Sequence, residues 1–124
     1  MKRKMFFIAL GFLILIAAGY FHFRSGIELT IANNTSQTLP GVSFSYTSGG
    51  TSLSDLKSKS SFRQRINPTS ESDLILNWTV ASGQTHSKNI DVYMEHNYRG
   101  WIKIVIDANS GATWTAKIKT PYDF

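Results

Sequence analysis

Few residues in this 124-residue sequence have the types and spacing that enzyme chemistry requires. Ser54 and Lys57 have the Ser-x-x-Lys spacing of one class of serine nucleophile, but the companion motifs of that class do not follow. His86 and His96 flank a segment with acidic residues, yet about ten residues of strand would separate the two rings by roughly 30 Å. The chain has no cysteine, so thiol catalysis, disulfides and Cys-based zinc sites are excluded. We therefore predict a non-enzyme with no catalytic residues, no metal and no cofactor.

The positive charge of the chain is concentrated at its N-terminus. Lys and Arg number 13 against 8 Asp and Glu, a formal net charge of +5. Residues 1–26 hold four basic residues and no acid, which leaves 9 basic and 8 acidic residues, or +1, for residues 27–124. A nearly neutral domain does not have the charge that nucleic-acid binding requires, so we expect no nucleic-acid partner.

The N-terminal segment has the pattern of a membrane anchor. Residues 1–4 form a basic tail, and residues 5–23 contain no Asp, Glu, Lys or Arg. A helix of 19 residues is roughly 28 Å long, close to the hydrocarbon thickness of a bilayer. We predict a transmembrane signal-anchor over 5–23, with the tail in the cytoplasm and the remainder outside. The alternative is a secreted protein, released by signal-peptide cleavage near Ala18 or Gly19.

After a short linker at 24–26, the apolar pattern changes to a period of two. Such alternation is typical of half-buried strands, and clusters of Gly, Asn, Ser and Pro separate the candidate strands. We predict an all-β domain over 27–124, an antiparallel β-sandwich of Ig-like architecture with about seven strands. The residues expected to face the core lie at Ile27–Ile31, Val42–Tyr46, Phe62–Ile66, Leu74–Val80, Ile90–Met94, Ile102–Ile106 and Trp114–Ile118.

Two short stretches resemble a known group of proteins. The first is Tyr93-Met94-Glu95-His96-Asn97-Tyr98-Arg99-Gly100, an aromatic-x-Glu-x-x-Tyr-x-Gly turn that precedes a strand. The second is Leu29-Thr30-Ile31-Ala32-Asn33-Asn34-Thr35, which follows directly on the anchor segment. Together they resemble small, uncharacterised, signal-anchored envelope proteins of Gram-positive bacteria. The resemblance implies an envelope location and a β domain, and it implies no activity.

The turn also supplies the first candidate site. Aromatic side chains that point away from the core can anchor a partner, while a neighbouring acid and base supply polar contacts. The alternative is that these residues only shape the turn, with Gly100 present for a positive φ. The candidate partner-binding residues are Tyr93, Glu95, Tyr98, Arg99 and Trp101.

The second candidate site is a basic stripe made of Lys57, Lys59, Arg63 and Arg65. All four positions are odd-numbered, so a continuous strand would present them on one face, suited to an anionic surface. The alternative is a charged edge strand that protects the sheet from aggregation.

These features favour a non-catalytic interaction or accessory module of the bacterial cell envelope, anchored in the membrane by residues 5–23. The partner would be an envelope protein or a wall polymer. The alternative is a secreted wall-polymer or carbohydrate binder, or less readily a hydrolase. A third possibility is an immunity or inhibitor protein, although no residue argues for it.

Overall fold

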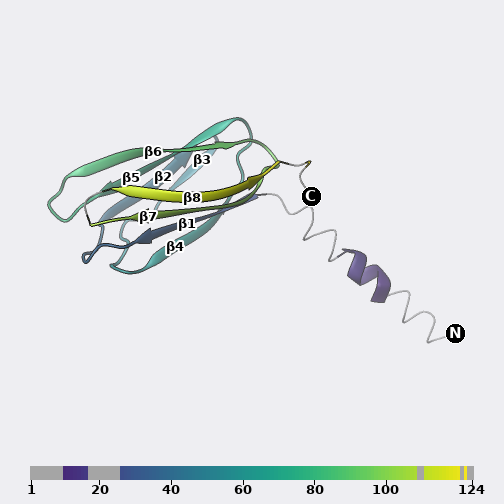
Figure 1. The fold of residues 1–124 in the computed structure, drawn as a ribbon, viewed down its shortest axis with the longest axis horizontal. Helices are drawn as coiled ribbons and strands as arrows, with labels where there is room; N and C mark the ends of the chain where they lie inside the picture. Colours follow the sequence, from purple (N-terminus) through teal and green to yellow (C-terminus); the bar gives the residue numbers. More distant parts are fainter. Residues whose placement is uncertain (1–9, 17–25, 109–110, 121, 123–124) are drawn as a thin grey trace.

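Two four-stranded β-sheets form the folded part of the chain in the computed structural model, which describes residues 10–16, 26–108, 111–120 and 122. The sheets pack face to face, as Figure 1 shows. The predicted β-sandwich is therefore confirmed. Its strands are β1 (Gly26–Asn33), β2 (Gly41–Tyr46), β3 (Gly49–Ser52), β4 (Ser61–Ile66), β5 (Ser72–Thr79), β6 (Thr85–Met94), β7 (Arg99–Ile106) and β8 (Ala112–Lys119).

The order of the strands decides which residues become neighbours. One sheet has the order β4-β1-β7-β8 and the other has the order β3-β2-β5-β6. We call them the first and the second sheet. In the first sheet β1 pairs with β7 in parallel, while its other pairs are antiparallel. The prediction of a purely antiparallel sandwich is wrong at this pair, because local alternation of residues does not specify strand direction.

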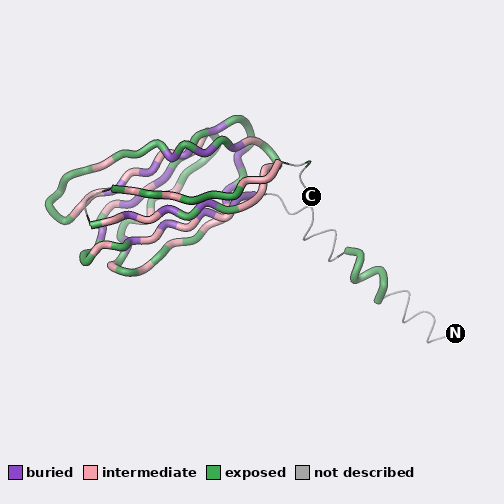
Figure 2. The backbone as a smooth tube through the Cα atoms, viewed as in Figure 1, coloured by how far each residue is buried: buried purple, intermediate pink, exposed green. Residues whose placement is uncertain are grey.

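Alternation of side chains builds the core, as predicted. On β1, Ile27, Leu29 and Ile31 are fully buried between the sheets, and the residues between them are half-buried on the outward side. The same alternation recurs along β5 and β7, and the alternating colours of the inner strands in Figure 2 show it. The large inward residues include Phe44, Leu74, Leu76, Trp78, Ile90, Met94, Ile102 and Ile104.

The sandwich has eight strands instead of the expected seven. The additional strand is β3, which begins at Gly49 in a Gly- and Ser-containing segment of the kind expected to separate strands. The segment instead folds back on β2, with Tyr46 opposite Gly49 and Ser43 opposite Ser52. Its sequence has no apolar alternation because none of its four residues is buried.

A buried asparagine fixes the end of β1. Asn33 is 1 % exposed, and its side-chain NH₂ donates to the carbonyls of Gln37 and Leu56 at 2.9 and 2.8 Å. Its side-chain oxygen accepts from the backbone N–H and the hydroxyl of Thr35. All these bonds compensate for the cost of burying the amide, so Asn33 holds the loop to β2 in place.

The N-terminal segment is described only in part. Residues 10–16 are helical, and the remainder of the predicted span at 5–23 lies outside the described residues. Within the described residues, no helix has the length and apolar character needed to cross a membrane. The exposed side chains of the helical residues are Leu10, Phe12, Leu13, Ile14, Leu15 and Ile16.

Candidate functional site

The turn between β6 and β7 is held by its own backbone. The N–H of Tyr98 donates to the carbonyl of Glu95 at 3.2 Å, and Asn97 has a φ of 66°. Gly100 has a φ of 129°, and a Cβ there would lie 1.9 Å from the carbonyl oxygen of Lys117. Only glycine fits this position. The structural role that the sequence suggested for Gly100 is therefore present.

The two exposed aromatic residues of the candidate site lie on different sheets. Tyr93 is on β6 in the second sheet, and Trp101 is on β7 in the first sheet. Each points away from the core, with exposed fractions of 50 % and 44 %. Because the sheets pack face to face, the two side chains point to opposite sides of the sandwich. The residues of the predicted site at 93–101 are therefore divided between two surfaces on opposite sides of the sandwich.

Tyr93 belongs to the surface that includes the turn. Its ring meets that of Tyr98 edge to face, with centroids 5.9 Å apart. Desolvation raises the pKa of the Tyr93 hydroxyl, and the hydrogen bond to Glu95 and the negative charge of Glu71 raise that pKa further. Glu95 and Tyr98 also line a hollow with Glu71 and His96 at this end of the sandwich.

The basic stripe is not one strand. Lys57 and Lys59 precede β4, which begins at Ser61, so the prediction of a continuous strand through all four residues is wrong. Lys59 has a φ of 60°, which interrupts an extended chain, and its ammonium donates to the carbonyl and side-chain oxygens of Asn34. Arg63 and Arg65 do share the outward face of β4.

Strand pairing adds four more basic residues to that outward face. Trp101 lies between Glu28 of β1 and Lys117 of β8. One step along the sheet, Thr30 separates Arg63 from Lys103. We call this surface the cationic face. Its six basic residues are Arg63, Arg65, Arg99, Lys103, Lys117 and Lys119.

Among the described residues, Glu28 is the acidic side chain on the cationic face, which gives six positive charges against one negative charge. The outward face of the second sheet carries Asp73 and Asp91 and, within the described part of the chain, no Lys or Arg. The nearly neutral net charge of the domain therefore conceals two faces of opposite sign. Alternation along the sequence puts Lys117 and Lys119 on one side of a strand, but it contains no information that places this strand beside β7.

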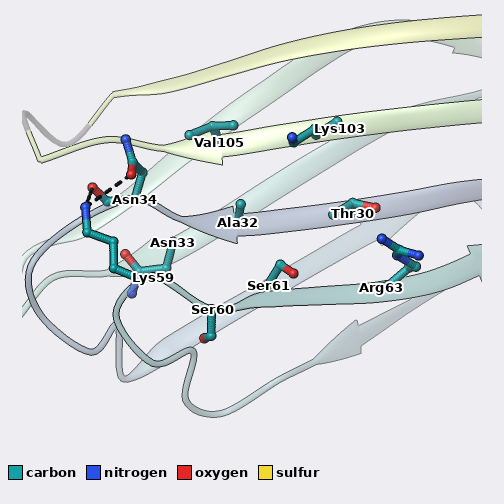
Figure 3. A pocket seen from close by; sticks show the side chains of 10 residues that line it. All are labelled: Thr30, Ala32, Asn33, Asn34, Lys59, Ser60, Ser61, Arg63, Lys103 and Val105. Atoms are coloured by element: carbon teal, nitrogen blue, oxygen red, sulfur yellow. Dashed lines mark hydrogen bonds between the residues drawn. The ribbon is translucent and has the colours of Figure 1, made fainter.

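A hollow of about 540 Å³ lies on the cationic face at the end far from Gly26. In Figure 3, Thr30 and Ala32 of β1 lie in the middle of the hollow, with Lys103 and Val105 of β7 on one side and Arg63 and Ser61 of β4 on the other. Lys59 closes one end, held by Asn34. The lining contains no acidic residue.

The described residues contain no group of three His, Asp or Glu side chains that could hold a metal. His86 stacks on Trp78 with centroids 5.3 Å apart, and His96 is exposed in the turn. In the described ranges the cationic face brings six basic side chains together on one surface.

No protein-family model matches this chain, and no curated protein matches it. One solved structure that does match is the NMR structure of a protein from Eubacterium rectale, with a TM-score of 0.51 at 13 % identity. The match covers 74 % of this chain and 88 % of the other. At that identity the likeness shows the fold alone.

Proposed function

We propose that this protein is a membrane-anchored, non-catalytic binding module of the bacterial cell envelope, with its β-sandwich outside the cytoplasm. The observation that carries the proposal is the helical segment 10–16, where six large apolar side chains are 44–71 % exposed. Exposed apolar side chains on every side of a helix require an apolar environment, and lipid supplies one. The surrounding 19 residues without charge support the same reading.

The direction of insertion follows from the flanking charges. Lys2, Arg3 and Lys4 precede the apolar segment, while Arg24 alone follows it. An excess of basic residues stays on the cytoplasmic side, so the sandwich that starts at Gly26 belongs on the other side.

A binding role is supported by the cationic face. Six basic side chains around an exposed tryptophan cost stability through mutual repulsion, and core packing does not require them. Aromatic and basic residues together are typical of contact surfaces. We therefore place the partner contact on Trp101 and its basic neighbours, and no longer on the whole 93–101 turn.

The alternative proposal is a secreted binder of anionic wall polymers, released by cleavage near Ala18 or Gly19. The hollow shown in Figure 3 supports this alternative, because its volume suits a small ligand group and its rim carries Lys59, Arg63 and Lys103.

Topology and cleavage can be tested together in bacterial cells that express the full chain. Because the chain has no cysteine, Ser87→Cys and Lys4→Cys each provide one labelling site. A membrane-impermeant maleimide should label Ser87→Cys in intact cells and label Lys4→Cys only after lysis. Extraction with alkaline carbonate should leave the protein in the membrane. The intact mass of the protein should include residues 1–26. Release into the medium with a mass starting near residue 18 would contradict the anchor and favour the alternative.

A further inference from the structure

The cations on the cationic face are arranged around the point where the anchor joins the domain. Gly26 is the first residue of β1, and Arg99 lies beside it on β7, with Lys119 beside Arg99 on β8. Arg65 donates from its guanidinium to the carbonyl of Gly26 at 3.1 Å. The basic side chains are therefore densest at the end of the sheet next to the anchor.

The joint between anchor and domain is short. If the apolar segment ends at residue 23, Arg24 and Ser25 separate it from β1. The three chain steps from residue 23 to Gly26 span at most about 10 Å, so the sandwich stays close to the headgroups in every orientation. Such confinement makes weak surface contacts effective.

We propose that the sandwich lies on its cationic face against the anionic lipid surface of the membrane in which residues 5–23 are anchored. This inference rests on the proposed anchoring and adds an orientation and a ligand, the phosphate-bearing headgroups of anionic lipids. Basic residues close to a bilayer are attracted by anionic headgroups. Tryptophan favours the interface between water and lipid, and Trp101 is exposed amid these cations.

Charge distinguishes this orientation from an upright domain. The end of the sandwich next to Gly26 also carries Glu71 and Glu95, which line the hollow beside the turn. An upright domain would press these acids toward the headgroups. Lying on the cationic face instead brings six basic residues and one acid to the surface.

The distance of the basic residues from the membrane also favours a domain that lies on its cationic face. In an upright domain, Lys103 would stand four residues of strand, or about 13 Å, farther from the membrane than Gly26 does. Electrostatic attraction is screened over about 8 Å at physiological salt, so Lys103 and Arg63 would then contribute little. Only contact along the face uses the whole set of cations.

The position of the cations at the anchored end also favours a lipid surface over a wall polymer. A polymer would use the far hollow, which Lys59, Arg63 and Lys103 line, and would not use the cations at the anchored end of the face. The polymer is therefore an outcome that the experiment has to detect.

The test uses the full chain in nanodiscs with an environment-sensitive fluorophore on one introduced cysteine. Thr115→Cys reports on the cationic face beside Lys103, and Ser87→Cys reports on the outward face of the second sheet. Nitroxide-labelled lipid headgroups quench a fluorophore that approaches the surface. Discs of phosphatidylcholine alone are compared with discs that contain half phosphatidylglycerol.

We expect quenching at residue 115 to increase severalfold in phosphatidylglycerol discs, with no change at residue 87, and to be lost in about 0.5 M NaCl. Equal quenching at the two positions, or none in discs that hold the chain, would overturn the proposed orientation while leaving the anchor intact. Failure of the chain to enter discs would overturn the anchor itself. A fluorophore at residue 115 that responds to soluble polyphosphate and not to phosphatidylglycerol would overturn the lipid proposal in favour of a polymer.

Discussion

The Nε atom of Arg63 lies 3.3 Å from a carboxylate oxygen of Glu28, which is the acid on the cationic face within the described residues. The pair joins neighbouring strands, and both side chains are well exposed, at 70 % and 40 %. Exposed pairs of this kind contribute only about 0–1 kcal/mol to stability. The main effect of Glu28 is therefore on the charge of the face.

Glu28→Gln should strengthen membrane contact without a large cost in stability. Removing the acid frees Arg63 and raises the net positive charge of the face by one. With the fluorophore at residue 115, the NaCl concentration that abolishes half of the quenching should rise. The free energy of unfolding should change by less than about 1 kcal/mol. A variant that dissociates at lower salt would contradict the role assigned to this pair.

Trp101→Ala should reduce surface contact and leave the fold intact. Trp101 is 44 % exposed, whereas Trp78 is 2 % exposed and belongs to the core. Truncation of a buried aromatic residue costs about 3–5 kcal/mol, so Trp78→Ala is the matched variant that should unfold in much less urea. Tyr93→Ala, on the opposite side of the sandwich, should not change quenching at residue 115. If Trp101→Ala melts the domain as Trp78→Ala does, Trp101 is part of the core.

Gly100→Ala should destabilise the sandwich strongly. The added Cβ would meet the carbonyl oxygen of Lys117 at 1.9 Å, and the φ of 129° is one that alanine rarely adopts. We expect a loss of about 3 kcal/mol or more in urea unfolding. Gly111→Ala is the control, since a Cβ at that position would have nothing within 4 Å, and its stability should be close to that of the natural sequence. Equal stability of the two variants would show that β7 and β8 approach less closely at Gly100.

Asn33→Ala should show that the buried amide is structural. The substitution leaves the carbonyls of Gln37 and Leu56 without their side-chain donor, and an unpaired buried polar group costs about 1–3 kcal/mol. Asn34→Ala removes an exposed neighbour and should cost less than about 1 kcal/mol. Urea unfolding of both variants provides the comparison, and a milder effect at Asn33 than at Asn34 would contradict the assignment.

The raised pKa of Tyr93 predicts a loss of stability in alkali. The folded state holds the phenol proton more tightly than the unfolded chain does, so stability falls as pH rises past the ordinary value of 10.0 toward the folded pKa. Glu95→Gln removes the negative charge and replaces the charged acceptor by a weaker neutral amide oxygen, so it should lower the pKa of Tyr93. NMR titration of the tyrosine ring carbons measures this directly. An unchanged pKa in the variant would show that Glu95 does not contribute to the raised value.

The core and the turn could be predicted from sequence, because both depend on local pattern. Alternation at Ile27–Ile31 and Ile102–Ile106 assigns the inward faces correctly, and the turn motif itself indicates the need for glycine at 100. The short strand β3 could not be found in this way because Gly49–Ser52 has no buried side chain, and its pairing with β2 alone makes it a strand.

The cationic face could not be predicted, because it depends on which strands are neighbours. Arg63 and Lys103 are 40 positions apart in the numbering and are brought together by β1, which pairs with β4 on one side and with β7 on the other. Local alternation contains no information on that order. For the same reason, closeness in sequence wrongly assigns Tyr93 and Trp101 to one surface although they lie on two.

The position of the basic residues, more than their number, should hold the domain against the membrane, and two double variants test this. Lys103→Glu with Lys117→Glu reverses two charges on the cationic face, and Lys57→Glu with Lys88→Glu makes the same change in net charge elsewhere. In phosphatidylglycerol nanodiscs, with the fluorophore at residue 115, the first double variant should lower the population of domains in contact with lipid by about tenfold or more. Each basic residue contributes roughly 1 kcal/mol to the attraction to an anionic membrane. The second double variant should retain its contact with lipid. Equal loss of lipid contact in both double variants would mean that net charge alone holds the domain at the membrane, and it would contradict a binding face on the first sheet.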